Sequence, residues 1–129
     1  MIAPDPSQTF SDIDLDNYEV PAAPKYIECR GFIYIIQDSA FPGFFKLGRS
    51  QSLKKRLMQY NSDRPFPTVR YSVFSTMFAD VHTVEEKILE KLYEETPPTT
   101  FSREWFTLAH IDRAIELIEL AEKEFEHAS

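Results

Sequence analysis

Three segments of the chain have the apolar pattern of β-strands. Residues 26–37 (YIECRGFIYIIQ) are rich in Ile, Tyr and Phe, which pack well on a pleated sheet. A Pro-Gly pair at 42–43 predicts a turn, and residues 44–50 (FFKLGRS) return as a second strand. Residues 68–78 alternate apolar and polar side chains and predict a third strand. The first two strands therefore form a hairpin.

Three other segments have apolar residues at helical spacing, at 52–61, 80–95 and 112–128. Prolines end the first two, because proline cannot continue a helix. A short aromatic segment at 103–108 (REWFTL) precedes the last helix, and its rings are expected to be buried. The order β-β-α-β-α-α predicts an α+β fold, in which a small three-stranded antiparallel sheet is flanked by helices.

The first 27 residues differ from the rest. They contain four prolines among acidic residues and have no sustained periodicity, so we predict an extended N-terminal arm, residues 1–27, before a single domain at 28–129. Within the arm, residues 8–19 alternate apolar and acidic side chains. Such a segment folds against a basic or apolar groove, in its own protein or in a partner protein. The simpler interpretation is a flexible, solubilising tail.

Composition narrows the function classes. A chain of 129 residues with 43% hydrophobic residues fits one folded domain. Its single cysteine, Cys29, excludes an internal disulfide and a multi-cysteine metal site. No apolar run has the length of a membrane span, and the N-terminus lacks the pattern of a signal peptide, so no membrane partner is predicted and the cytoplasm is the expected compartment.

Charge is distributed unevenly along the chain, whose net charge is −7. Residues 1–28 hold six acids and one base, residues 29–79 hold two acids and eight bases, and residues 80–129 hold thirteen acids and five bases. The middle third therefore carries +6 between flanks of −5 and −8. A basic middle is what a phosphate-facing surface on an acidic body requires, although scattered, solvated bases give the same count.

Five short motifs occur in a fixed order: GFIYII, FPGFFKLG, SLKKRLMQYN, VEEKILEKL and REWF. Together they resemble the GIY-YIG nuclease superfamily, and most closely its phage and bacterial branch, whose second motif is of the Lys-Ile-Gly type. The resemblance covers about residues 29–118. It implies a metal-dependent endonuclease that cleaves a DNA phosphodiester at a site with one Mg²⁺ or Mn²⁺ ion. A phage-encoded member would act in the host cytoplasm.

The resemblance also implies roles for individual residues. Tyr34 corresponds to the tyrosine of the first motif, and Gly48 to the glycine of the second, where it is expected at a structural turn. Arg56 matches the catalytic arginine, and Glu86 matches the glutamate that binds the metal. The family pattern favours Glu86 over its neighbour Glu85. The residues expected to contact phosphate or DNA are Arg49, Lys54, Lys55, Tyr60 and Ser102.

These residue types suit phosphodiester chemistry on physical grounds. The guanidinium of Arg56 is a permanently charged fork that matches phosphate oxygens. A single carboxylate, that of Glu86, suffices for Mg²⁺, which keeps several water ligands. Lys46 stands where most family members have a tyrosine, so the general base is left open between Tyr34, Lys46 with a lowered pKa, and a metal-bound hydroxide.

Two classes of function compete at this point. One is an active endonuclease, which the joint presence of Tyr34, Arg56 and Glu86 favours. The alternative is a catalytically weak or inactive module of the same fold that binds nucleic acid or a protein. The acidic arm and the net negative charge support this alternative, because a nuclease without a separate DNA-binding domain needs electrostatic affinity for DNA. The arm is expected to regulate or mediate binding, since residues 8–19 can lie against the basic middle and compete with DNA.

Overall fold

The computed structural model describes residues 15–21, 29–96 and 104–128. Its elements in chain order are the 3-10 helix η2 (Leu15–Asn17), strands β1 (Phe32–Asp38) and β2 (Phe44–Ser50), helix α1 (Leu53–Asn61), strand β3 (Val69–Phe74), helix α2 (Val81–Glu95), strand β4 (Trp105–Thr107), the 3-10 helix η3 (Leu108–His110) and helix α3 (Ile111–Glu124). The predicted α+β class and the order β-β-α-β-α-α are confirmed.

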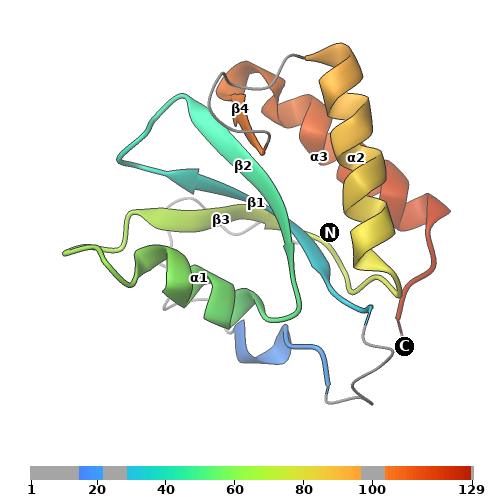
Figure 1. Cartoon of the computed structure of the whole chain (residues 1–129), viewed down its shortest axis with the longest axis horizontal. Coiled ribbons are helices and arrows are strands. Elements are labelled where there is room, and N and C mark those ends of the chain that lie inside the picture. Colours follow the sequence, from blue (N-terminus) through green and yellow to red (C-terminus); the bar gives the residue numbers. More distant parts are fainter. Residues whose placement is uncertain (1–14, 22–28, 97–103, 129) are drawn as a thin grey trace.

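One antiparallel sheet forms the centre of the domain, with the strand order β3-β1-β2-β4. Helix α1 covers one face, and α2 and α3 cover the other (Figure 1). The sheet has four strands, so the prediction of three is wrong. The fourth strand, β4, comes from the short aromatic segment and pairs Trp105 with Lys46. Three residues are too few to produce the alternation that identifies a strand in a sequence.

Strand β1 is buried on both faces and separates two cores. Ile33 and Ile35 point toward α2 and α3, where they pack with Phe45 and Leu47 of β2. Side chains at the alternating positions, including Tyr34, point toward α1. Each core is therefore built on one face of β1, with Phe45 and Leu47 of β2 in the first core and Val69 and Tyr71 of β3 in the second. The register of β1 against its neighbours decides which side chains reach which helix.

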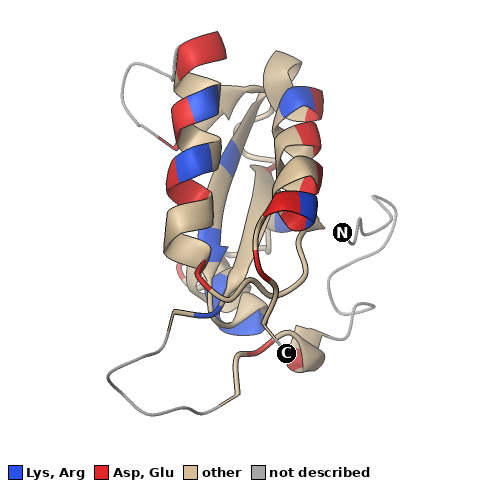
Figure 2. Cartoon of the chain, turned by 90° about the vertical axis from the view of Figure 1, so that its right-hand side faces the viewer, with Lys and Arg blue, Asp and Glu red and all other residues tan. Residues whose placement is uncertain are grey.

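Acidic and basic residues are spread along α2 and α3, which lie side by side (Figure 2). Arg113 of α3 donates to Glu95 of α2 at 2.8 Å, which joins the two helices. Acidic residues outnumber basic ones on both helices. The basic middle of the sequence, in contrast, supplies β1, β2, α1 and β3. Negative charge therefore collects on the α2–α3 layer, and positive charge collects on the sheet and α1.

Residues 15–21 of the predicted arm pack against the domain. Leu15 is only 6% exposed, and the Tyr18 ring meets the rings of Phe32 and Phe74 edge to face. The backbone amide of Leu53 donates to the carbonyl of Tyr18. A flexible arm is therefore the wrong description of these residues, because their apolar side chains fill the core beneath α1. The rest of the arm, residues 1–14 and 22–27, lies outside the described residues.

The anchoring of the arm makes a stability prediction. Leu15→Ala is expected to lower the free energy of unfolding by about 2 kcal/mol, because it removes buried apolar contacts and leaves a cavity. Urea denaturation followed by circular dichroism measures this change. Leu120→Ala, at an exposed position on α3, is the matched control and is expected to have little effect. Equal stability of the Leu15 variant and the wild type would show that the arm does not anchor here.

Candidate functional site

The packing of Tyr34 against Gly48 organises the face of the sheet that meets α1. The two residues are direct partners in the β1–β2 ladder. A Cβ atom placed on Gly48 would lie 2.5 Å from the Tyr34 hydroxyl and 2.7 Å from Cζ, so the ring lies directly across the glycine. Gly48 is thus an interior residue of β2, and its predicted place at a structural turn is wrong. The turn glycine of the hairpin is Gly43, with φ of 95°.

The Tyr34 side chain leads to a polar cluster between β1, β2 and α1. Its hydroxyl shares a hydrogen bond of 2.9 Å with the hydroxyl of Tyr60 on α1. The ammonium of Lys46 on β2 lies 5.1 Å from the centre of the Tyr60 ring and forms an ion pair with Glu104 at 3.2 Å. Tyr71 of β3 packs edge to face on Tyr34 from the other side. Three of the residues predicted for the site, Tyr34, Lys46 and Tyr60, therefore converge.

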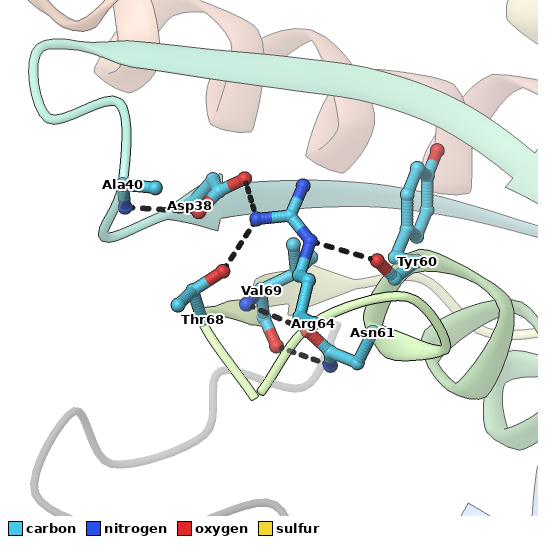
Figure 3. A network of polar contacts seen from close by, with 7 residues as sticks. All are labelled: Asp38, Ala40, Tyr60, Asn61, Arg64, Thr68 and Val69. Atoms are coloured by element: carbon cyan, nitrogen blue, oxygen red, sulfur yellow. Dashed lines mark hydrogen bonds and ion pairs between the residues drawn. The ribbon is translucent and has the colours of Figure 1, made fainter. Parts of the chain in front are cut away.

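A network of hydrogen bonds holds the end of α1 that carries Tyr60 (Figure 3). Arg64 bonds to the buried carboxylate of Asp38 at 2.7 Å, and its Nε donates to the backbone carbonyl of Tyr60 at 3.0 Å. The side chain of Asn61 both donates to and accepts from the backbone of Val69. These contacts attach the last turn of α1 to β1 and β3. The Tyr60 ring is therefore presented to Tyr34 by a rigid helix end.

Burial and neighbouring charges set the protonation of the cluster. Burial raises the pKa of Tyr34 far above its usual value, and the hydrogen bond with Tyr60 raises it further, against an opposing effect of the Arg56 charge. Burial lowers the pKa of Lys46, but its interactions with Tyr60 and Glu104 outweigh burial, and the pKa is raised. At neutral pH Tyr34 is a neutral phenol and Lys46 is charged. Lys46 does not have the lowered pKa that a general base would need.

Arg56 supplies a positive charge on the same side of the sheet. Its guanidinium lowers the pKa of both Tyr34 and Tyr71 electrostatically, against the dominant effect of their burial. Among the described residues, no carboxylate forms an ion pair with it. The arrangement therefore presents a cation and neutral hydroxyl groups together, and these are the groups that bind and stabilise an anionic oxygen.

The glutamate that faces the sheet is Glu85, so the expectation that Glu86 points inward is wrong. The Glu85 side chain is 13% exposed and bonds to Arg49 of β2 at 3.2 Å. Glu86 is 67% exposed and pairs with His82 one turn earlier on the outside of α2. Helix phase explains the difference, because Glu85 lies four residues after buried Val81 and three before buried Ile88. The apolar spacing in the sequence already contained this signal.

Two carboxylates lie near each other at the β2 edge of the site. Burial raises the pKa of Glu85, Arg49 lowers it, and the charge of Glu104 raises it again, so the net pKa is raised. Glu104 also pairs with Lys46, which connects the cluster beneath α1 with the Arg49–Glu85 pair. Sequence reasoning missed Glu104, because nothing in its spacing distinguishes it from a surface acid.

A basic cleft of about 530 Å³ lies where the ends of several elements meet. Its lining includes the side chains of Arg30, Arg49, Lys55, Arg56, Gln59 and His82. Of the predicted DNA-contacting residues, Arg49 and Lys55 lie here, with the predicted catalytic residue Arg56. No local pattern distinguishes Arg30 or Gln59, which reach the cleft only through the tertiary fold.

Two other predicted contacts have a different place. Lys54 forms an ion pair with Asp16 of the arm rather than facing the cleft. Ser102 lies outside the described residues. Within the described ranges, no three His, Cys, Asp or Glu residues are grouped closely enough to hold a metal ion by themselves. In that same part of the chain, no helix has the length and apolar character needed to cross a bilayer.

Comparison with known proteins identifies the family. The T5orf172 domain matches residues 31–122, more than half of the chain, so the chain belongs to the T5orf172 domain family. This phage-associated domain is of the nuclease-like kind, so the resemblance seen in the motifs is confirmed at that coarser level, and membership of the GIY-YIG superfamily stays a prediction. No curated protein and no solved structure matches the chain significantly.

The Tyr34–Gly48 packing generates a prediction about the site. Gly48→Ala is expected to destabilise the domain by about 1–3 kcal/mol, because the added methyl group displaces the Tyr34 ring from Tyr60. Thermal or urea unfolding measures the change. In a Tyr34→Ala background the same substitution is expected to cost much less, since the clashing ring is absent. Equal costs in the two backgrounds would contradict this account of Gly48.

Proposed function

We propose that this domain is a divalent-metal-dependent DNA endonuclease that hydrolyses or nicks a phosphodiester. The observation that carries the proposal is the convergence of Tyr34, Tyr60, Lys46 and Arg56 beside a basic cleft, with the Glu85 carboxylate at the β2 edge. Family membership supports a nuclease-like or DNA-binding module. The finer assignment of substrate, metal and residue roles is ours.

Each side chain has a task in the proposed reaction. Arg56 and Lys46 place positive charge where a phosphorane develops negative charge, and this stabilisation is commonly the largest contribution to catalysis. The half-buried Tyr60 hydroxyl is the one that can reach phosphate or the attacking water, and the buried Tyr34 hydroxyl orients it through their hydrogen bond. The Tyr34 hydroxyl is held in place by Gly48 below and Tyr60 beside it. Geometry rather than a lowered pKa is its contribution.

Glu85 is the residue proposed to hold the metal, in place of Glu86. Its carboxylate offers the hard oxygen ligand that Mg²⁺ and Mn²⁺ prefer, and its partner Arg49 also lines the basic cleft. A site with few carboxylates, Glu85 with Glu104 nearby, fits an ion that takes most of its ligands from water and phosphate. When bound, the ion would neutralise charge on the phosphate and the leaving oxygen.

A pair of adjacent variants tests this assignment. Glu85→Gln is expected to reduce plasmid nicking in Mg²⁺ or Mn²⁺ by more than about 100-fold, because a metal ligand is lost. Glu86→Gln, one residue along the helix and exposed, is the matched control and is expected to stay near the wild-type rate. If the Glu86 variant lost nicking and the Glu85 variant kept the wild-type rate, the metal ligand would be Glu86, as assigned from the sequence.

A second variant tests the role of Arg56. Arg56→Lys keeps the positive charge but removes the planar fork, so nicking is expected to fall about 100-fold while DNA affinity changes little. Cleavage rates and a fluorescence-anisotropy titration on the same DNA separate the two effects. A parallel loss of affinity and rate would make Arg56 a binding residue only. DNA binding by the wild type without any nicking would favour the alternative, a nucleic-acid-binding module without catalysis.

A further inference from the structure

We propose that the basic cleft is a subsite for a second backbone phosphate, one that flanks the phosphodiester held by Tyr60 and Arg56. This inference rests on the proposed function, since it assumes a nucleic-acid strand at the site. It names what the cleft binds and which residues set the affinity. Arg56 joins the two places, because it lines the cleft and its charge acts on the Tyr34 hydroxyl. Tyr34, Tyr60 and Lys46 do not line the cleft.

The position of the cleft in the fold favours an anion. Helix α1 begins here after its N-cap Ser52, and α2 begins here with Val81 and His82. The N-terminus of a helix of this length carries partial positive charge and amide donors. Lys55, Arg56 and Gln59 lie on neighbouring positions of the first turns of α1, so their side chains reach the same cavity. The charged side chains and the helix N-termini therefore both attract an anion into the cleft.

The cations of the cleft differ in their interaction partners. Arg49 is paired with Glu85, and Arg30 donates to the backbone carbonyl of Pro21 at 2.9 Å. Lys55 and Arg56 have no carboxylate partner among the described residues. Neighbouring cations without carboxylate partners repel each other. A phosphate group that binds between them relieves this repulsion and lowers the electrostatic energy. Of these two cations, Lys55 is the one that the candidate catalytic cluster does not use.

The arm forms one wall of this subsite. Glu19 and Val20 line the cleft, and the Val20 amide donates to the carbonyl of Gln51 at 2.8 Å. The Glu19 carboxylate accepts a hydrogen bond from the Ser52 hydroxyl at 2.9 Å, at the start of α1. Glu19 is the acidic member of the lining, so its charge opposes an incoming phosphate. The subsite therefore predicts opposite effects for neutralising Lys55 and neutralising Glu19.

The test is the salt dependence of binding to a duplex oligonucleotide without terminal phosphates, measured by fluorescence anisotropy without divalent metal. Lys55→Gln is expected to weaken binding several-fold and to reduce the slope of log K against log[salt] by about 0.9, the value for one lost phosphate contact. Glu19→Gln is expected to tighten binding several-fold. Lys91→Gln on α2 and Glu119→Gln on α3 are matched charge controls away from the cleft. Both are expected to bind as the wild type does.

The outcomes separate this inference from the proposed function. Wild-type binding with a Lys55 variant indistinguishable from the Lys91 control would overturn the subsite and leave the endonuclease proposal standing. No binding by the wild type, together with no nicking, would overturn both. An effect of Lys55 that appears only on 5′-phosphorylated duplexes would also overturn the inference, because the cleft would then be a terminal-phosphate site. Circular dichroism of each variant confirms that it is folded.

Discussion

The site depends on one close packing contact, that of the Tyr34 ring across the backbone of Gly48. The two residues are direct partners in the β1–β2 ladder, and a side chain at position 48 would occupy the space that the ring takes. The ring therefore fits only when glycine is its partner. Because side chains alternate across a strand, this register also sends Lys46 toward α1 and Arg49 toward α2. A slip of one residue would exchange the two sets. The positions of all the candidate residues on β1 and β2 therefore follow from a single pairing.

Segregation of charge gives the second constraint. The protein carries a net charge of −7, yet the acids of the two covering helices lie on the layer away from α1 (Figure 2). Four of the eight cations of the middle region, Arg30, Arg49, Lys55 and Arg56, line the cleft at the start of α1. A polyanion is therefore repelled by one layer and attracted by the other, which orients it on approach. The arm moderates the attraction, because it places Glu19 at the cleft and Asp16 on Lys54.

Much of the fold could be predicted from the sequence, because strand and helix periods were strong where elements were long. The short strand β4 was missed, since three residues show no period. The packing of Leu15 and Tyr18 matches one of the two interpretations of the arm, which its alternating apolar and acidic residues left open. Tyr34, Lys46, Arg56 and Tyr60 were named from motifs, and the structure brings them together. The inward glutamate was misassigned although its helix phase was present in the sequence. Arg30 and Glu104 depend on tertiary contacts that no local pattern encodes.

The lysine at position 46 changes what the site can contribute. A tyrosine there would offer a hydroxyl, whereas Lys46 stacks its ammonium on the Tyr60 ring and pairs with Glu104, and these contacts keep it charged. Tyr34 stays a neutral phenol, because the same burial that orders the ring opposes an anionic form. The described side chains of the cluster beneath α1 therefore supply positive charge and hydrogen-bond donors, and Glu104 is the carboxylate that pairs with Lys46 there. In the proposed hydrolysis, the proton of the attacking water must leave toward the β2 side of the site, where Glu85 and Glu104 lie.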